Sequence, residues 1–246
     1  MLSATAALAA EGLKTDWSLS PTYNTIMAVA AGAGLITLVW FIRDLWVKQE
    51  RNIEGYAFAF GILGFILTTT GLHMTLTWPI KGLPWDNIIF GETSLGFGVL
   101  LAATSWYLWR NREALRTAER PIKVLADLVR PISLFVFGLG LALVGIGVAG
   151  LWYQFFVAPA EEPISGLFAD YPIVEAIFMS GLFFLVALGA LLFPWAVKRE
   201  AVVGRPGTVH RVAGWAWVVG GLGFFLFGAL NFFTHIGLIF NTNVPS

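Results

Sequence analysis

Hydrophobic and polar residues alternate in long blocks along this chain. Six apolar segments are separated by breaks that are polar or contain proline, and they span residues 22–42, 55–78, 88–109, 132–157, 172–197 and 212–240. A helix needs roughly 20 apolar residues to cross about 30 Å of hydrocarbon, and in lipid it keeps its backbone groups hydrogen-bonded. The pattern therefore predicts an all-α fold, an integral membrane bundle of six transmembrane helices.

These segments also set the expected domain organisation. We expect one six-helix transmembrane domain over residues 22–240 and a short C-terminal tail over residues 241–246. Residues 1–21 have no basic start and only a short apolar run, so they do not resemble a cleaved signal peptide. They are expected to form a tail or a short helix at the membrane interface.

Composition supports the membrane interpretation and removes some chemistry. Hydrophobic residues make up 57% of the 246 residues and charged residues 12%, whereas soluble domains carry about 25% charged residues. The 27 glycines and 11 tryptophans are typical of membrane helices and their interfaces. The chain has no cysteine, which excludes disulfide bonds, thiolate metal sites and a cysteine nucleophile.

The charges are divided unequally between the two faces of the predicted bundle. Thirteen of the 15 basic residues, with seven acidic ones, lie in the breaks after the first, third and fifth segments. The opposite face has eight acidic residues and only Lys14 and Lys81 as basic ones. Because Lys and Arg are enriched in cytoplasmic loops, we expect both termini to lie outside the cytoplasm. The expected location is the inner (cytoplasmic) membrane of a prokaryote.

Residues 115–130 form the longest break on the basic face. Apolar residues recur between its charges, at Leu115, Ile122, Leu125, Leu128 and Val129. This pattern favours an amphipathic helix lying on the cytoplasmic surface, with a solvated loop as the alternative.

Small residues form stripes along three of the predicted helices. The stripes are Gly61, Gly64, Thr68, Gly71 and Thr75 in the second segment, Gly140, Gly147 and Gly150 in the fourth, and Gly221, Gly228, Asn231 and His235 in the sixth. Stripes of this kind let neighbouring helices approach closely in lipid, so we expect them to face the bundle interior. His235 should then face protein, whereas His73 lies on the other side of its helix from Gly61.

The middle of each segment contains no Asp, Glu, Lys or Arg. This absence argues against a retinal-type lysine Schiff base and against the chains of ionisable groups that proton pumps and ion-coupled transporters use. The sequence also has no Walker-type phosphate loop and no Ser/His/Asp grouping. We therefore predict no catalytic centre, and a carrier would have to handle a neutral solute.

Polar residues gather at the depth of the outer surface. His73 lies 22 residues after Arg51 and His235 lies 24 after Arg211, which puts both about 33–36 Å from the basic charges. Glu92 and Glu175 begin the third and fifth segments on the same side. His73, Glu92, Glu175 and His235 could together hold a transition metal, or His73 and His235 could ligate a haem. The alternative is that the histidines are interfacial anchors and the glutamates favour the first helical turn through the helix dipole. A loop over residues 158–171 could cover this region as a lid or contact an external partner.

Two runs carry a resemblance to a known family. GLHMTLTWPI (residues 71–80) and NIIFGETSLGFGVLLAATSWYLWR (residues 87–110) resemble the domain of unknown function 981 family, multi-pass membrane proteins of bacteria and archaea. The resemblance implies a membrane fold, and it implies no activity or catalytic residue.

Three functions remain open. The first is a non-catalytic accessory or structural subunit of a larger membrane complex, possible in an energy-transducing assembly, with membrane lipids and other membrane subunits as partners and no nucleic acid. The second is a haem- or metal-binding redox protein using the outer His/Glu cluster. The third is a neutral-solute carrier that depends on Asn231 and Gln154.

Overall fold

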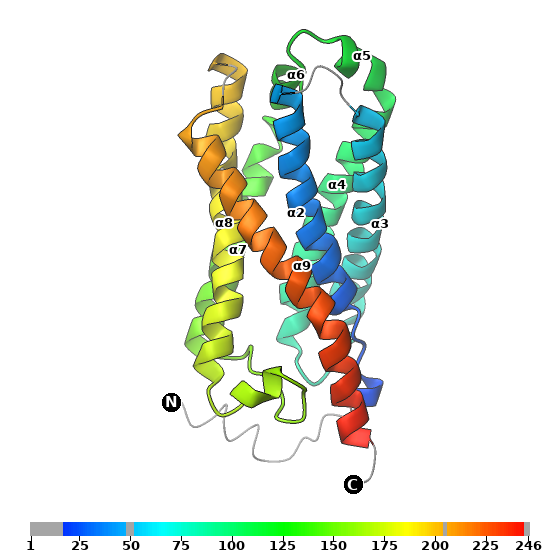
Figure 1. Ribbon diagram of the computed structural model, residues 1–246, viewed down its shortest axis with the longest axis vertical. Coiled ribbons are helices and arrows are strands. Elements are labelled where there is room, and N and C mark those ends of the chain that lie inside the picture. Colours follow the sequence, from blue (N-terminus) through cyan, green and yellow to red (C-terminus); the bar gives the residue numbers. More distant parts are fainter. Residues whose placement is uncertain (1–16, 48–51, 204–205, 244–246) are drawn as a thin grey trace.

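The described part of the protein consists of helices joined by loops (Figure 1). The computed structural model describes residues 17–47, 52–203 and 206–243. Within these ranges six helices are long and apolar enough to cross a membrane. They are α2 (Asn24–Val47), α3 (Ile53–Thr77), η2 with α4 (Asn87–Glu92 and Thr93–Arg110), α7 (Ser133–Tyr153), α8 (Pro172–Val203) and α9 (Thr208–Asn243). The all-α prediction and the six spans are confirmed.

The helix ends differ from the predicted boundaries for local reasons. α7 stops at Tyr153 because Gln154 takes a left-handed conformation, with φ of 51°, and its N–H bonds the carbonyl of Gly150. α8 and α9 extend beyond the apolar segments, because a helix that leaves the hydrocarbon can continue into water with its backbone hydrogen bonds intact. Of the predicted N-terminal region, residues 1–16 lie outside the described residues and Trp17–Leu19 form a 3₁₀ turn, η1. α9 includes the first three residues of the predicted C-terminal tail, and residues 244–246 lie outside the described part.

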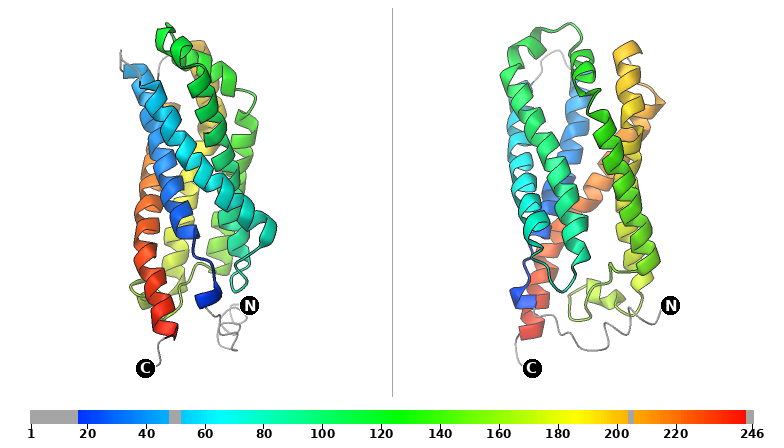
Figure 2. Two further views of the ribbon diagram at one scale, coloured as in Figure 1. Left: turned by 90° about the vertical axis from the view of Figure 1, so that its right-hand side faces the viewer. Right: turned by 180° about the vertical axis from the view of Figure 1, so that it is seen from behind.

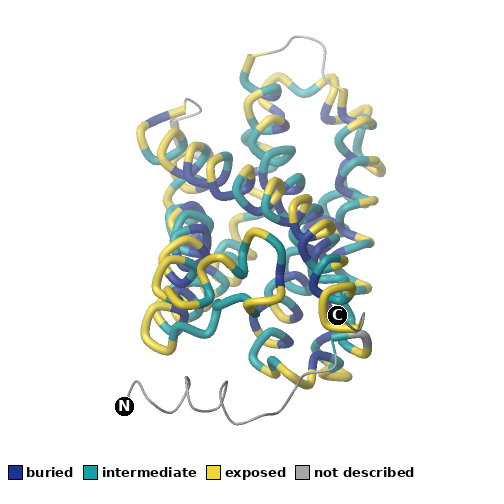
Figure 3. Tube along the Cα trace, turned by 60° about the horizontal axis from the view of Figure 1, so that its bottom comes forward, coloured by how far each residue is buried: buried dark blue, intermediate teal, exposed yellow. Residues whose placement is uncertain are grey.

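The outward faces of the bundle are apolar. Phe58, Trp106 and Trp215 are exposed by 70%, 66% and 69%, and the buried positions line the inner sides of the helices (Figure 3). A water-soluble monomer does not expose so much continuous apolar surface. Together with the six spans, this surface identifies an integral membrane protein.

The helices pack as three close pairs: α3 with α4, α7 with α8, and α2 with α9. α9 has 36 residues, or about 54 Å at 1.5 Å per residue, and it crosses the bundle obliquely, contacting both α8 and α2 (Figure 1). The result is an open arc in the order α4, α3, α2, α9, α8, α7. Its two ends, α4 and α7, touch at few positions and are visibly separated from behind (Figure 2).

The small-residue stripes form the contacts within these pairs, as predicted. A Cβ on Gly64 would lie 2.6 Å from the backbone nitrogen of Ala102 on α4. A Cβ on Gly228 would lie 2.8 Å from both Ala28 Cβ and the backbone nitrogen of Val29 on α2. The α3–α4 and α2–α9 pairs therefore depend on a close approach that a larger residue at these positions would block.

The bundle has two ends of opposite character, named here by their charges. The basic end contains the C-termini of α2, α4 and α8, and the acidic end contains η2, the loop of residues 154–171 and the C-terminus of α9. At the basic end the predicted surface helix is present as two pieces, α5 (Arg112–Thr117) and α6 (Pro121–Val129). The break falls before Pro121 because proline has no N–H to continue α5 and disfavours helical geometry in the residue before it.

Candidate functional site

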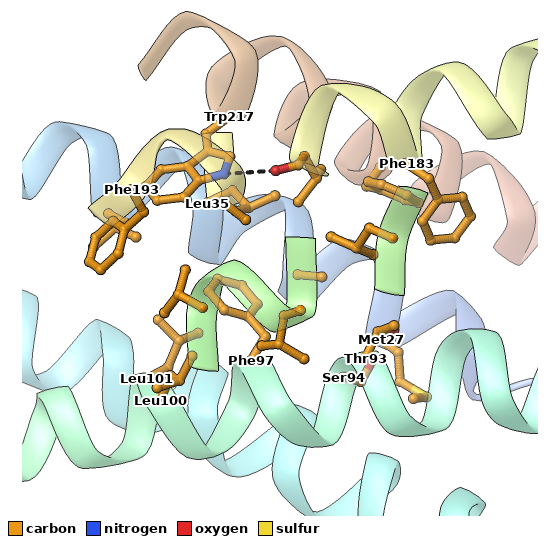
Figure 4. A pocket seen from close by; sticks show the side chains of 18 of the residues that line it. Met27, Leu35, Thr93, Ser94, Phe97, Leu100, Leu101, Phe183, Phe193 and Trp217 are labelled. Carbon is orange, nitrogen blue, oxygen red and sulfur yellow. Dashed lines mark hydrogen bonds between the residues drawn. The ribbon is translucent and has the colours of Figure 1, made fainter. Parts of the chain in front are cut away.

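A cavity of about 220 Å³ lies at the centre of the arc. Its walls come from α2, η2, α4, α7, α8 and α9, with Val129 and Ile132 at the basic end, and α3 contributes no residue. Figure 4 shows Met27, Leu35, Phe97, Phe183 and Trp217 directed toward this space from four helices. The cavity thus lies inside the open arc, where the helices are least tightly packed.

The cavity lining offers almost no free hydrogen-bonding groups. The Thr104 hydroxyl donates to the carbonyl of Leu100 at 2.8 Å, and Thr93 bonds the carbonyl of Ile89 in the same way. The Trp217 indole N–H donates to the carbonyl of Val186 at 3.1 Å (Figure 4). Of the polar side chains that line the cavity among the described residues, Ser94 is then the one whose hydroxyl has no hydrogen bond inside the protein. Water needs two to four polar partners to be held, so the cavity suits an apolar occupant.

Aromatic rings close the cavity at its acidic end. Phe183 and Phe224 line it and meet edge to face at 5.2 Å between ring centroids. Phe156 stacks on Phe183 at 5.8 Å, and Phe155 joins it to Trp85 beside η2. At the other end, Phe193 packs on Trp217 with centroids 6.0 Å apart. The remaining wall is the seam between α4 and α7, where Gly96 faces Leu139.

The π-helical turn η2 positions the α4 wall. Asn87 begins it and is 1% exposed, and its side chain bonds the N–H and the carbonyl of Ile80 at 3.1 and 2.8 Å. The same amide donates to the carbonyl of Pro84. These bonds fix the connection from α3, and η2 then runs without a break into α4, bringing Phe90, Thr93 and Ser94 to the cavity. Single π-turns often occur at functional sites, which is consistent with this placement.

His235 lies at the acidic end, as predicted, beside a carboxylate that sequence reasoning did not select. Its Nε2 is 3.8 Å from Oε1 of Glu162, a residue of the 154–171 loop that is 8% exposed. Burial raises the pKa of Glu162, and the Thr234 hydroxyl partly opposes this effect. The loop is attached to α9 further along, where Asn241 donates to the carbonyl of Glu161 at 2.8 Å and Gly237 contacts Pro163. It therefore lies over the end of the bundle in the manner of a lid.

Glu175 belongs to the same region but binds backbone. Its carboxylate accepts the N–H of Ala158, which ties the start of α8 to the loop, and it interacts electrostatically with Glu162. Glu175 therefore lies near His235 in the fold, but no hydrogen bond or ion pair of the described residues joins the two side chains.

His73 and Glu92 belong to the same end of the bundle, but each has surroundings other than those of His235. His73 is exposed on α3, and its Nδ1 is 2.9 Å from the hydroxyl of Tyr23, just before α2. Glu92 ends η2 with its side chain exposed. No three His, Asp or Glu side chains in the described ranges come together so that they could hold a metal ion. The four-residue metal site therefore gains no support from the described residues, and ligation of a haem by His73 and His235, which needs only two histidines, stays a prediction.

Sequence reasoning missed the cavity because its lining residues are ordinary Leu, Phe, Val and Ala. Such residues look the same whether they face lipid, a neighbouring helix or an empty space. The one signal was the group of small and hydroxyl residues after Glu92, namely Thr93, Ser94 and Gly96, which lies in the second family-like segment.

Comparison with known proteins agrees with the fold. Residues 20–237 match the family described as "Protein of unknown function (DUF981)". No curated protein and no solved structure matches the chain.

Proposed function

The chain belongs to the DUF981 family, and we propose that it is a non-catalytic membrane protein that binds a neutral, apolar, membrane-soluble molecule in its central cavity. The observation that supports this most is the cavity itself, about 220 Å³ of apolar space at the centre of six spans. Of the alternatives open from the sequence, this proposal stands nearest the neutral-solute carrier, with an oily rather than a polar cargo.

The size of the cavity favours an occupant. In a protein core an unfilled cavity costs about 24 cal/mol per Å³, so 220 Å³ would cost on the order of 5 kcal/mol if it stayed empty. An engineered dry cavity of about 150 Å³ binds benzene. The present one could hold a ring of that kind with a short substituent, or part of a hydrocarbon chain entering from the bilayer.

The residues that line the cavity decide which chemical class of molecule it can bind. None of the described residues around the cavity has a titratable side chain, so they offer no general acid, base or charged nucleophile. It also has no charge to balance an ionic ligand. The Ser94 hydroxyl can bond one carbonyl or hydroxyl group of an otherwise apolar molecule. Such a molecule would enter sideways between α4 and α7, where the bundle is least closed.

Photolabelling in lipid nanodiscs tests this function. A diazirine derivative of hexadecanol is photolysed with the protein, and labelled residues are located by peptide mass spectrometry. We expect label on lining residues of α4, α7 and α8 that is displaced by unlabelled hexadecanol. Label confined to the outward faces of the helices would contradict the proposal.

Two variants sharpen the test. Ala190 lines the cavity and is 5% exposed, so Ala190→Phe should fill part of it and reduce cavity labelling at least about tenfold, the equivalent of 1.4 kcal/mol. Ala142 on α7 is exposed, and Ala142→Phe should leave cavity labelling unchanged. If Ala190→Phe fails to fold, Ser94→Ala provides a milder change that should weaken the alcohol selectively over the corresponding alkane.

We also propose, as a second candidate, the accessory-subunit role expected from the sequence. It is supported by apolar side chains at the acidic end around the 3₁₀ turn η3 (Ser165–Phe168), where Leu167 is 79% exposed. Ile164 just before it has φ of 68° in a tight turn closed by the Ser165 N–H and the Pro163 carbonyl, an unusual conformation for a β-branched residue. Native mass spectrometry of membranes in mild detergent should then find a complex larger than the 26.9 kDa chain, and Leu167→Asp should dissociate it. Recovery of the chain alone, with or without lipid, would contradict this role.

For the orientation, we propose that the basic end faces the cytoplasm of a prokaryotic cell and that both termini lie outside. The support is the excess of Lys and Arg at that end. Reporter fusions test it: alkaline phosphatase at the C-terminus should be active and green fluorescent protein dark, and the reverse result would invert the assignment.

A further inference from the structure

A groove runs along the outer surface between α3 and α4, away from the central cavity. Gly61, Thr68, Ala102 and Ser105 are among the small residues at its floor, and Phe58, Phe65, Trp106 and Trp109 are among its larger walls. Ser105 is held in place by donating its hydroxyl to the carbonyl of Ala57 at 2.6 Å. The floor exists because the stripe that brings α3 onto α4 leaves no side-chain bulk along the seam.

The groove has the length of one lipid chain in one leaflet. Its lining on α3 extends from Ala57 to Thr69, which is about 18 Å at 1.5 Å per residue. One leaflet supplies half of the hydrocarbon thickness of about 30 Å. The groove therefore begins near the basic end and finishes close to the middle of the bilayer.

Two arginines stand at its basic end, each on a tryptophan of the groove wall. The guanidinium carbon of Arg110 is 5.8 Å from the centre of the Trp106 ring, and that of Arg112 is 5.1 Å from the Trp109 ring. Arg112 also donates to the carbonyl of Trp109 at 2.8 Å. These contacts hold both cations at the level of the interfacial aromatics, where lipid headgroups lie.

The arginines at this end differ in their ion pairs. Glu54 lies 3.8 Å from Arg112 and also pairs with Arg116, which in turn contacts Glu113. Arg110 makes no ion pair with any residue in the described ranges. Among the described residues, Arg110 is thus the arginine of this group without a carboxylate partner.

We propose that the groove binds an anionic phospholipid of the leaflet at the basic end, with one acyl chain between α3 and α4 and its phosphate at Arg110 and Arg112. The apolar groove matches the chain, and the charge of Arg110 matches that of the phosphate. This site is independent of the central cavity, to which α3 contributes nothing.

Titration by native mass spectrometry in mild detergent tests the site with two lipids that share their chains, dioleoyl phosphatidylglycerol and dioleoyl phosphatidylcholine. A surface Lys or Arg attracts an anionic lipid by about 1 kcal/mol, so phosphatidylglycerol should bind about fivefold to tenfold more tightly. Arg110→Gln should remove about fivefold of this preference. Arg120→Gln changes the same charge at the same end, outside the groove, and should leave the preference unchanged.

Three results would overturn the proposal. They are equal binding of the two lipids, an equal effect of Arg110→Gln and Arg120→Gln, and binding of glycerophosphoglycerol, the deacylated headgroup, as tightly as the intact lipid. The last would place the headgroup at the arginines with no role for the groove. Both substitutions are at exposed positions, so folding of the variants is not at risk.

Discussion

Replacing Gly64 by alanine tests whether the α3–α4 pair depends on backbone contact. The new Cβ would lie 2.6 Å from the backbone nitrogen of Ala102, and 3.0 Å from both its Cα and the carbonyl oxygen of Gly98. Carbon atoms pack best at about 3.5–4.0 Å from their neighbours. All three contacts are with backbone, so no side chain can rotate away and the helices must separate locally by about 1 Å.

Two opposing effects set the magnitude. Alanine is favoured over glycine inside a helix by about 1 kcal/mol, whereas overpacking costs about 1–3 kcal/mol. Separation also weakens dispersion along the whole stripe, and in lipid no hydrophobic force compensates for that loss. We expect a net destabilisation of about 1–2 kcal/mol, or a Tm lower by about 2–8 °C for a chain of this size.

Gly145 on α7 provides the matched control. It is an exposed glycine inside a spanning helix, and a Cβ there would meet nothing within 4 Å. Gly145→Ala should therefore keep only the favourable helix effect and leave Tm unchanged or slightly raised. Tm is measured for both variants in one detergent by tryptophan fluorescence and by the fraction that remains monodisperse after heating. If Gly64→Ala is as stable as Gly145→Ala, the close contact of α3 and α4 is not what holds the pair together.

Three further predictions concern polar groups at the acidic end. Burial raises the pKa of Asp86 to about 7, so between about pH 4 and 7 the folded state keeps a proton that the unfolded state loses, and stability falls as pH rises through this window. Asp86→Asn should therefore raise Tm at pH 8, where it adds at most about 4 kcal/mol to the free energy of unfolding, and should leave Tm unchanged at pH 4. Equal effects on Tm at both pH values would refute this reasoning. Asn87→Ala removes three hydrogen bonds and leaves the buried N–H of Ile80 unpaired, which should lower the free energy of unfolding by about 2–4 kcal/mol. The control Asn111→Ala removes one side-chain bond, to the carbonyl of Tyr107, and should cost under about 1.5 kcal/mol in the same thermal assay. His73→Ala removes the hydrogen bond and the ring contact with Tyr23 and should cost about 1 kcal/mol, and Tyr23→Phe, which keeps a ring, should cost the same or less. Loss of a Soret band or of stoichiometric metal in His73→Ala alone would instead favour the haem or metal hypothesis.

The membrane fold could be predicted because the bilayer imposes one dominant rule. Every span must be apolar over a fixed thickness and hydrogen-bonded within itself, so the six segments were visible as long blocks of sequence. The glycine stripes identified the packing faces of α3, α7 and α9 for a similar reason, since only small residues allow close approach in lipid. Which helices those faces would meet depends on the order of helices around the bundle, and no single sequence contains that order.

The candidate site was less predictable, and His73 and His235 show why. Their similar depth follows from counting residues at 1.5 Å each, and depth is one coordinate of three. The rotation of each helix and its neighbours decide whether two side chains meet. His235 meets Glu162 because the 154–171 loop turns back over α9, whereas His73 meets Tyr23 at the start of α2. Apart from the small and hydroxyl residues after Glu92, the cavity has no sequence signature, because it is defined by where side chains are absent.

The pairing of α2 with α9 has a consequence for how the protein is made. α3 with α4, and α7 with α8, are neighbours in sequence and can associate soon after each leaves the ribosome. α2 emerges first, but its partner surface, where Gly32 faces the Gly221 carbonyl and the Phe225 backbone, belongs to the last helix. The first span must therefore wait in the bilayer through the synthesis of the other four. Until α9 is inserted, that narrow face of α2 is uncovered in the bilayer.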